Sequence, residues 1–259
     1  MAPEILNILY SFNSVRLEEM DRVKLMDRYD TKYLLPANRI PDLLKLMLGR
    51  YRVLEINNER ISSYTTVYLD TPDFTCFNQH VTERTGRLKV RFRTYNTTGN
   101  SFLEIKKKTK KGRTVKWRIE NSPSENSFNA TATEFIKTRV PNDPESLKPV
   151  LENNFKRITF TGFDTSERIT LDLDISYASP DGKSAELPLV AILELKCRGL
   201  AARSPFSKLI KQFSIYPTGF SKYCIGCAML HDLPLKNILK PKILLLNRIE
   251  NEYNGSLSA

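Results

Sequence analysis

The chain has 259 residues, which suits one large domain with an appendage, and its apolar fraction of 41% is enough to build a core. Its 40 lysine and arginine residues outnumber 29 acidic residues, and the net charge of +11 favours anionic partners such as nucleic acid, phosphate compounds or an anionic membrane. The sequence shows no signal peptide, and its longest apolar run near the C-terminus, Ile243 to Leu246, is far shorter than the roughly 20 residues of a membrane-spanning helix.

The first 24 residues read as a polar N-terminal extension that is partly helical. A strand is expected over residues 24–35, because Arg28, Asp30 and Lys32 alternate with less polar residues, and Pro36 ends it. A short helix is then expected from residue 38 or 39, with Gly49 as a C-cap.

Strands follow in quick succession. Residues 64–70 alternate, and residues 74–82 read as a short helix or turn. Three further strands are predicted over residues 87–95, 101–107 and 113–120, joined by turns at 96–100 and 110–112. Consecutive strands with such short links indicate an antiparallel meander.

The rest of the chain mixes helices and strands. Residues 121–129 read as a loop and residues 128–154 as helices interrupted by prolines. Three strands are predicted over residues 155–162, 168–176 and 189–196, with a turn at 180–182. Helices are predicted over residues 204–215 and 221–230, and a flexible tail from Asn251.

Three of these strands place basic residues at every second position, with apolar residues between them. The residues are Lys89, Arg91 and Arg93; Lys106 and Lys108; and Lys116 and Arg118. Because alternate side chains of a strand point to opposite faces, each strand has one cationic face and one apolar face. Neighbouring cations repel one another unless an anion lies between them, so the pattern points to a ligand with many negative charges in a row.

The alternation leaves two arrangements open. One is a sheet with an ordinary solvated face. The other is a closed barrel whose polar face points inward, with helices on its apolar outside and room for a ligand. Phe92 and Trp117 lie on the face opposite the basic residues, so we expect them in the core and not in base stacking.

Two strands place a carboxylate beside a lysine on the same face, namely Glu104 with Lys106 and Glu194 with Lys196. A carboxylate next to bound phosphates commonly holds Mg²⁺ or Mn²⁺, and a cross-strand salt bridge is the alternative. The two histidines, His80 and His231, are too few for a histidine-rich metal site.

Four cysteines are present, and they show no disulfide framework, so we expect a reducing compartment, the cytoplasm. The Cys224-x-x-Cys227 spacing is typical of redox and zinc sites, but a second Cys or His pair at zinc spacing is missing. The apolar residues around this pair favour a buried helix.

Six short segments occur in an order that resembles the VTC domain, the polyphosphate polymerase domain of the vacuolar transporter chaperone complex. They are Arg28-Tyr29-Asp30-Thr31-Lys32-Tyr33, Tyr68-Leu69-Asp70-Thr71, Arg91-Phe92-Arg93, Leu103-Glu104-Ile105-Lys106, Leu193-Glu194-Leu195-Lys196 and Phe220-Ser221-Lys222-Tyr223. The resemblance covers residues 25–235, which would form the domain, with 1–24 as the extension and 236–259 as a basic C-terminal segment and flexible tail.

This resemblance implies membership of the triphosphate tunnel metalloenzyme, or CYTH-like, superfamily. The implied fold is α+β, an antiparallel β-barrel tunnel with a polar basic lumen and flanking helices. The implied activity is transfer of the γ-phosphate of ATP onto a growing inorganic polyphosphate chain, with Mn²⁺ or Mg²⁺ as the divalent metal.

The resemblance also assigns residues. Six would act in catalysis and bind phosphate: Lys32, Arg91, Arg93, Lys106, Lys116 and Lys222. Three more would bind phosphate, Arg157, Arg168 and Lys196, and Glu194 would hold the metal. The first strand reads Arg28-x-Asp30-x-Lys32 where the superfamily favours Glu-x-Glu-x-Lys, which fits the polymerase branch better than a two-metal triphosphatase.

Two other functions remain open at this stage: a triphosphatase of the same fold that hydrolyses nucleoside or inorganic triphosphate, and a non-enzymatic module that binds polyphosphate or nucleic acid. The expected partners are ATP and inorganic polyphosphate, with no specific nucleic acid. The basic residues Lys236, Lys240, Lys242 and Arg248 either touch a membrane peripherally or form a solvated helix face. The oligomeric state is open.

Overall fold

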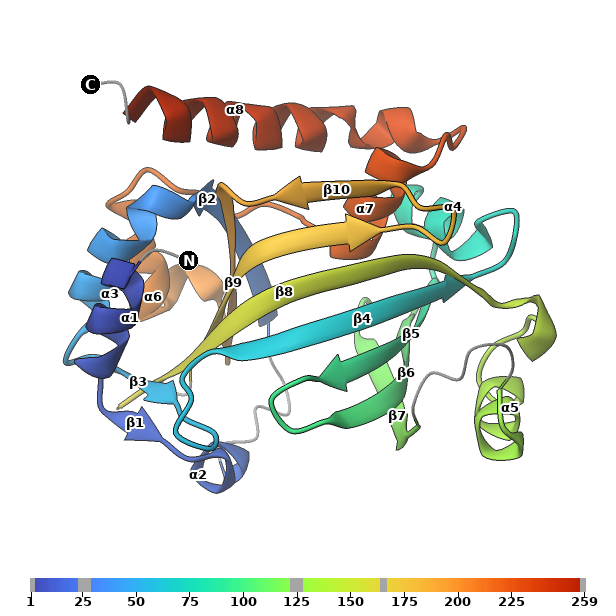
Figure 1. Cartoon of the computed structure of the whole chain (residues 1–259), viewed down its shortest axis with the longest axis horizontal. Helices are drawn as coiled ribbons and strands as arrows, with labels where there is room; N and C mark the ends of the chain where they lie inside the picture. The colour runs from blue at the N-terminus through green and yellow to red at the C-terminus, as the bar shows by residue number, and fades with distance from the viewer. Residues whose placement is uncertain (1–2, 23–28, 122–127, 164–166, 257–259) are drawn as a thin grey trace.

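A computed structural model describes residues 3–22, 29–121, 128–163 and 167–256 (Figure 1). Within these ranges, strands join into one large sheet, antiparallel along its main path. The order along that path is β2 (Tyr29–Pro36), β11 (Val190–Cys197), β9 (Glu167–Ala178), β8 (Lys148–Gly162), β4 (Ser62–Asp70), β5 (Leu88–Tyr95), β6 (Asn100–Lys108) and β7 (Thr114–Glu120). Three short strands extend it: β10 (Ser184–Leu187) pairs with β9, β3 (Tyr51–Leu54) with β8, and β1 (Ser14–Val15) with β3.

The outer face of the β2, β11, β9 and β8 part of the sheet is apolar. Tyr33, Leu193, Leu171 and Phe160 belong to one buried cluster there. The cluster includes residues of α1 (Pro3–Tyr10), α3 (Ile40–Met47) and α6 (Pro205–Lys211), which lie together on the left in Figure 1. Because strand side chains alternate, this packing turns the intervening polar residues of the same strands to the opposite, inner face.

A second buried cluster covers the outer face of β5 and β6. Val90, Phe92 and Ile105 belong to it together with Phe135 of α5 (Ala130–Lys137). The rings of Phe92 and Phe128 stack with centroids 6.1 Å apart, which confirms the core position expected for Phe92. The basic residues between these apolar side chains are thereby directed inward.

Two helices are fixed to the end of β4 by one buried carboxylate. Asp70 accepts hydrogen bonds from the backbone N–H groups of Cys76 at 2.8 Å and Phe77 at 2.9 Å, at the start of α4 (Thr75–Val81). It also accepts one from the hydroxyl of Tyr223 in α7 (Lys222–Leu230). A carboxylate with this many donors anchors both helices at the same point of the sheet.

Helix α7 is buried on nearly every side, and its cysteines 224 and 227 are buried and unpaired, as the sequence indicated. A Cβ atom added at Gly226 would lie 2.6 Å from Cδ1 of Tyr177 and 2.7 Å from Cδ2 of Leu151. The helix can therefore approach the inner face of β8 and β9 because this position has no side chain.

The sheet corrects one expectation, that of a closed barrel. In the described part of the chain its end strands, β2 and β7, do not pair with each other. The stretch before α7 occupies the free edge of β2, where Thr218 N donates to the Lys32 carbonyl at 2.8 Å. The ammonium of Lys32 on β2 reaches the Phe220 carbonyl at 2.7 Å, and that of Lys89 on β5 reaches Ser221 Oγ at 3.0 Å. Residues 218–221 thus lie between the two sides of the open sheet.

The predicted α+β tunnel fold is otherwise confirmed: an antiparallel sheet with a polar inner face and helices outside it. The β5–β6–β7 meander is confirmed as well. Among the described residues, no helix is both long and apolar enough to cross a bilayer.

Other expectations were wrong in detail. Strand β8 begins at Lys148, inside the range 128–154 that the prolines suggested was helical. Within that range, α5 and one 3₁₀ turn are the helical elements that come before it. Pairing of β8 with both β4 and β9 outweighs local propensity there. Strand β10 was not predicted. Helix α8 (Lys240–Ser256) runs along the top of the molecule in Figure 1 and continues past Asn251, where a flexible tail was expected.

Candidate active site

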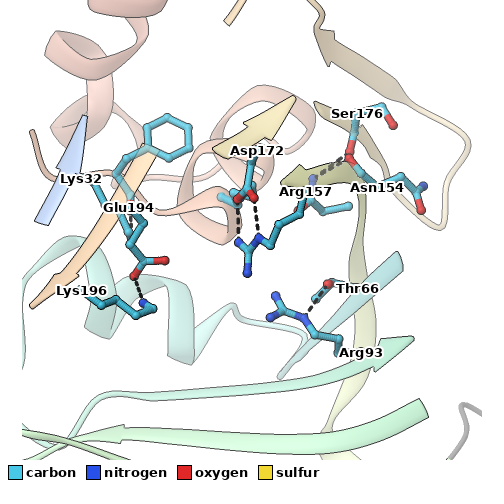
Figure 2. Close-up of polar contacts among 12 residues, drawn as sticks. Lys32, Thr66, Arg93, Asn154, Arg157, Asp172, Ser176, Glu194 and Lys196 are labelled. Atoms are coloured by element: carbon cyan, nitrogen blue, oxygen red, sulfur yellow. Dashed lines mark hydrogen bonds and ion pairs between the residues drawn. The ribbon is translucent and has the colours of Figure 1, made fainter. Parts of the chain in front are cut away.

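Charged side chains from several strands converge on the inner face of the sheet. Figure 2 shows Lys32, Glu194 and Lys196 on one side, the Arg157–Asp172 pair above, and Arg93 beside Thr66 on the other side, all directed toward a shared space. Strand pairing explains the convergence, since Lys32 lies directly opposite Glu194 and Arg157 directly opposite Asp172.

One carboxylate on the β6 side is enclosed by cations. Glu104 is fully buried and accepts hydrogen bonds from Arg91 Nε at 2.9 Å and Arg91 Nη2 at 2.7 Å, and its other oxygen binds the Lys116 ammonium. Burial alone would raise the pKa of Glu104, but Arg91, Arg93 and Lys116 outweigh it and hold that pKa well below its usual range. Glu104 is therefore a fixed negative charge that positions two cations.

A second carboxylate does the same on the β9 side. Asp172 accepts from Arg157 Nε at 2.5 Å and Arg157 Nη2 at 2.7 Å, and from the Lys222 ammonium at the start of α7. Burial opposes ionisation, but Arg157 and Lys222 lower the pKa of Asp172 to about 2. The bidentate Arg157–Asp172 pair joins β8 to β9 at the inner face, and Lys222 joins α7 to the same carboxylate.

The third carboxylate, Glu194, accepts from Lys196 Nζ at 2.7 Å, and the same ammonium lies 3.5 Å from Asp30. Burial acts against its charge, while Lys196, Lys32 and Arg157 lower the pKa of Glu194 below its usual range. No group of three or more His, Cys, Asp or Glu side chains suited to a metal ion occurs among the described residues. Glu194 alone supplies one hard oxygen donor, so a divalent cation fits here only if phosphate oxygens complete its coordination, as is common for Mg²⁺.

Other inward cations have no carboxylate partner within the described ranges. Arg93 donates only to Thr66 Oγ1, at 3.3 Å, and Lys106 has no ion pair. Burial and then Arg91 and Arg157 lower the pKa of Arg93 to about 10. Arg91, burial and Arg93 lower the pKa of Lys106 well below its usual value. These two groups are the strongest candidates for binding an added anion, because an anion would relieve the repulsion that they experience.

Among the described residues, Lys32 and Lys89 donate hydrogen bonds only to neutral oxygens, the carbonyl of Phe220 and the hydroxyl of Ser221 respectively. Burial, followed by Lys32 and Arg91, lowers the pKa of Lys89 to about 8. Both lysines touch the segment before α7, so that segment brings the β2 and β5 cations toward each other.

Two aromatic rings support the cations. Tyr64 and Phe155 stack with centroids 5.2 Å apart and an interplanar angle of 1°. The Arg93 and Arg157 guanidinium groups lie 5.7 Å and 5.4 Å from the Tyr64 centroid, and Lys222 Nζ lies 4.2 Å from that of Phe155. Such cation–π contacts help to stabilise cations that are partly or fully removed from water.

The structure gathers most of the residues that the sequence analysis singled out. Those on the shared inner face are Lys32, Arg91, Arg93, Lys106, Lys116, Arg157, Glu194, Lys196 and Lys222. Arg168 also lies on β9, opposite Lys196, but one of its nitrogens donates to the Met20 carbonyl of α2 (Leu17–Arg22) at 3.1 Å.

Sequence reasoning did not assign a role to Asp172 or to the Tyr64–Phe155 pair. Asp172 shares the two-residue period of Arg168 and Thr170, which is the signal that places it on the inner face. Its pairing with Lys222 had no such signal, because the two residues are 50 positions apart in the chain.

Comparison with known proteins gives one family. The model of the VTC domain matches residues 27–231. No curated protein sequence matches the chain.

Among solved structures, a candidate adenylate cyclase from Bacillus halodurans aligns at a TM-score of 0.49 with 14% identity, over 76% of this chain and 96% of that one. A candidate adenylyl cyclase from Hippeastrum, described as having a dominant triphosphatase activity, aligns at 0.47 with 14% identity, over 81% and 99%. An RNA triphosphatase from S. pombe aligns at 0.30 with 10% identity, over 74% and 77%.

Proposed function

Because this chain belongs to the VTC domain family, we propose that it is a polyphosphate polymerase that transfers the γ-phosphate of ATP onto a growing inorganic polyphosphate chain within the tunnel. The observation that carries the proposal is the set of half-buried inward cations without a carboxylate partner among the described residues, above all Arg93 and Lys106. A chain of phosphates supplies negative charges at short, regular intervals, which matches cations on neighbouring strands.

The cations that are paired with carboxylates have a different role, which is to stabilise charge during the transfer. Glu104 holds Arg91 and Lys116 in fixed geometry through ion pairs. Asp172 holds Arg157 and Lys222 in the same way. Each such cluster carries one negative and two positive charges, so it keeps a net positive charge toward the tunnel. Preorganised cations of this kind stabilise charge that develops on a transferring phosphoryl group without reorganising during the reaction.

The carboxylates favour transfer to phosphate over hydrolysis. A hydrolase benefits from a base that takes a proton from water. Glu104 and Asp172 have pKa values lowered by their arginine and lysine partners, so both are weak bases. A terminal phosphate acceptor is already anionic and needs no base, so positioning and charge stabilisation suffice.

We assign a divalent cation, Mn²⁺ or Mg²⁺, to Glu194, with phosphate oxygens as its remaining ligands. When bound, such a cation would neutralise negative charge on the phosphate oxygens. Around it, Lys32, Lys196 and Arg157 would hold the chain from the β2, β11 and β8 side, while Arg91, Arg93, Lys106 and Lys116 would hold the triphosphate from the β5–β7 side. Arg168 would meet the chain nearer to α2.

The test is to incubate the purified protein with ATP and Mn²⁺ and to resolve the products on a polyacrylamide gel. We expect acid-labile phosphate chains of increasing length. Orthophosphate without chains would favour a triphosphatase, and the absence of both products under varied metals would refute an enzymatic role. Arg93→Ala should reduce chain synthesis by roughly 100-fold, as is typical for loss of one charge-stabilising donor. Arg203→Ala, at an exposed position, is the control and should retain activity.

A further inference from the structure

The hairpin that joins β6 to β7 is the most basic exposed segment of the described structure. Its sequence from Lys107 to Arg113 contains five basic residues and no acidic one: Lys107, Lys108, Lys110, Lys111 and Arg113. Within the described ranges, the four lysines have no carboxylate within salt-bridge distance, and Lys110 and Lys111 are exposed. Like charges this close repel, so an anion bound across these four lysines would reduce the repulsion between them.

This hairpin continues the row of cations on the inner face. On β6, Glu104, Lys106 and Lys108 point to the same side, because side chains alternate along a strand. Lys106 lies opposite Lys116, and Lys108 lies opposite Thr114. Residues two apart on a strand are about 7 Å apart, so Lys108 places a cation about 7 Å from Lys106 in the direction of the turn. The backbone holds Lys108 there, since Gly86 N donates to its carbonyl at 2.8 Å and its N–H donates to the Arg87 carbonyl at 3.0 Å.

We propose that this hairpin is a binding site outside the tunnel for inorganic polyphosphate, which holds the part of a long chain that extends beyond the catalytic cations. The proposal rests on the proposed function, because only a protein that handles long chains needs such a site. Three exposed or half-exposed cations, Lys108, Lys110 and Lys111, provide point charges that follow a flexible phosphate chain without requiring one register.

The surroundings favour this occupant over other polyanions. Single-stranded nucleic acid is typically bound by exposed aromatic rings beside the basic residues. Here the nearby Trp117 is half-buried, and Arg139 lies 6.0 Å from its ring. A membrane surface is typically bound by a basic face with adjoining large apolar side chains. In the described part of this hairpin and its strands, Val115 is the large apolar residue that is exposed.

The test compares two triple variants of the full chain. In K108Q/K110Q/K111Q the hairpin loses three charges, and in the control K137Q/K208Q/K211Q three exposed lysines on α5 and α6 are lost instead. Binding of a long inorganic polyphosphate, about a hundred phosphates, and of tripolyphosphate is measured by titration calorimetry at two salt concentrations. We expect the hairpin variant to bind the long chain about tenfold more weakly, with a shallower salt dependence, since each exposed charge contributes modestly. Its affinity for tripolyphosphate, which the tunnel cations hold, should equal that of the control.

Equal binding of the long chain by both variants would overturn the proposal. A loss of tripolyphosphate binding in the hairpin variant would also overturn it, because the hairpin would then belong to the tunnel site. The measurement needs no turnover, so it separates the two ideas. A protein that makes no chains but shows the length-dependent loss refutes the polymerase proposal alone. A polymerase without that loss refutes the hairpin site alone.

Discussion

Lys106 on β6 lies directly opposite Lys116 on β7, and both side chains face inward. Like charges directly opposite each other destabilise a sheet. Lys116 is compensated by Glu104, whereas Lys106 has no ion pair among the described residues, and the neighbouring cations lower its pKa. The charge of Lys106 is therefore electrostatically unfavourable for the fold, as is common for residues that serve function and not stability.

Replacing that lysine should separate binding from stability. Lys106→Met keeps the length of the side chain and removes the repulsion, so we expect unfolding to require about 1 kcal/mol more free energy. That corresponds to a rise in melting temperature of about 2–4 °C for a chain of this size. Affinity for tripolyphosphate should fall roughly 10- to 100-fold, because a charge-assisted contact is lost. Thermal unfolding and calorimetric titration measure the two quantities.

The matched control is Lys107→Met, on the opposite face of the same strand. It should leave tripolyphosphate affinity unchanged. If both substitutions weaken binding equally, the inner face is not the binding surface.

Glu194→Gln should leave phosphate binding intact and remove turnover. Lys196 keeps Asp30 at 3.5 Å, so its position is retained, while the amide is a much poorer ligand for a hard cation. We expect chain synthesis to fall roughly 100-fold or more at saturating Mn²⁺. Long polyphosphate should still bind at least as tightly, because one negative charge is gone from the tunnel. Glu186→Gln, at an exposed position of β10, is the control, and unchanged synthesis by Glu194→Gln would contradict the metal assignment.

Phosphate affinity should decline as pH rises through about 8. Burial lowers the pKa values of Lys89, Lys116 and Lys222 to about 8, and at Lys116 and Lys222 it outweighs the opposite effect of Glu104 and Asp172. Above that pH these lysines lose their charge unless a phosphate holds it. Tripolyphosphate should therefore bind with proton uptake near pH 8, which calorimetry in buffers of different ionisation enthalpy detects. Binding without proton uptake between pH 7.5 and 9 would contradict the prediction.

The same lowered lysine pKa values should make the folding stability rise with pH, whereas phosphate affinity should fall with pH. The ordinary pKa of a lysine is 10.5, so between about pH 8 and 10.5 the unfolded chain holds more protons than the folded one. Stability increases with pH wherever the unfolded state binds more protons. We thus expect these lysines to make the unliganded protein more resistant to urea at pH 9.5 than at pH 7.5. Saturating tripolyphosphate should remove or reverse this trend, since it favours the charged lysines.

Gly226→Ala tests the position of α7. Alanine is the better helix former by about 1 kcal/mol. At this position, however, the added Cβ would lie within 3 Å of Tyr177 and Leu151, both buried. Overpacking of this kind costs about 1–3 kcal/mol, so we expect net destabilisation in urea unfolding and weaker phosphate binding through displaced Lys222. Gly255→Ala, where nothing lies within 4 Å, is the control and should be neutral or slightly stabilising. Equal effects of the two substitutions would show that α7 has room to move.

Several features of the fold follow from the sequence because they depend on neighbouring residues. The two-residue alternation of Lys89, Arg91 and Arg93 with Val90 and Phe92 predicts both the strand and its two faces. The meander follows from short turns between such strands. Strand β8 could not be predicted in this way, since its first residues follow several prolines and its pairing partners β4 and β9 are distant in the chain.

The sequence by itself determined that cations share one face of each strand, because alternation is a local property of the extended backbone. It could not determine which cations are already neutralised. Only the tertiary structure brings Lys222 to Asp172 and leaves Arg93 and Lys106 without a carboxylate among the described residues. The physical reason is that ion pairing depends on distance in space, and the curved sheet and the segment before α7 set those distances through packing of the outer apolar faces.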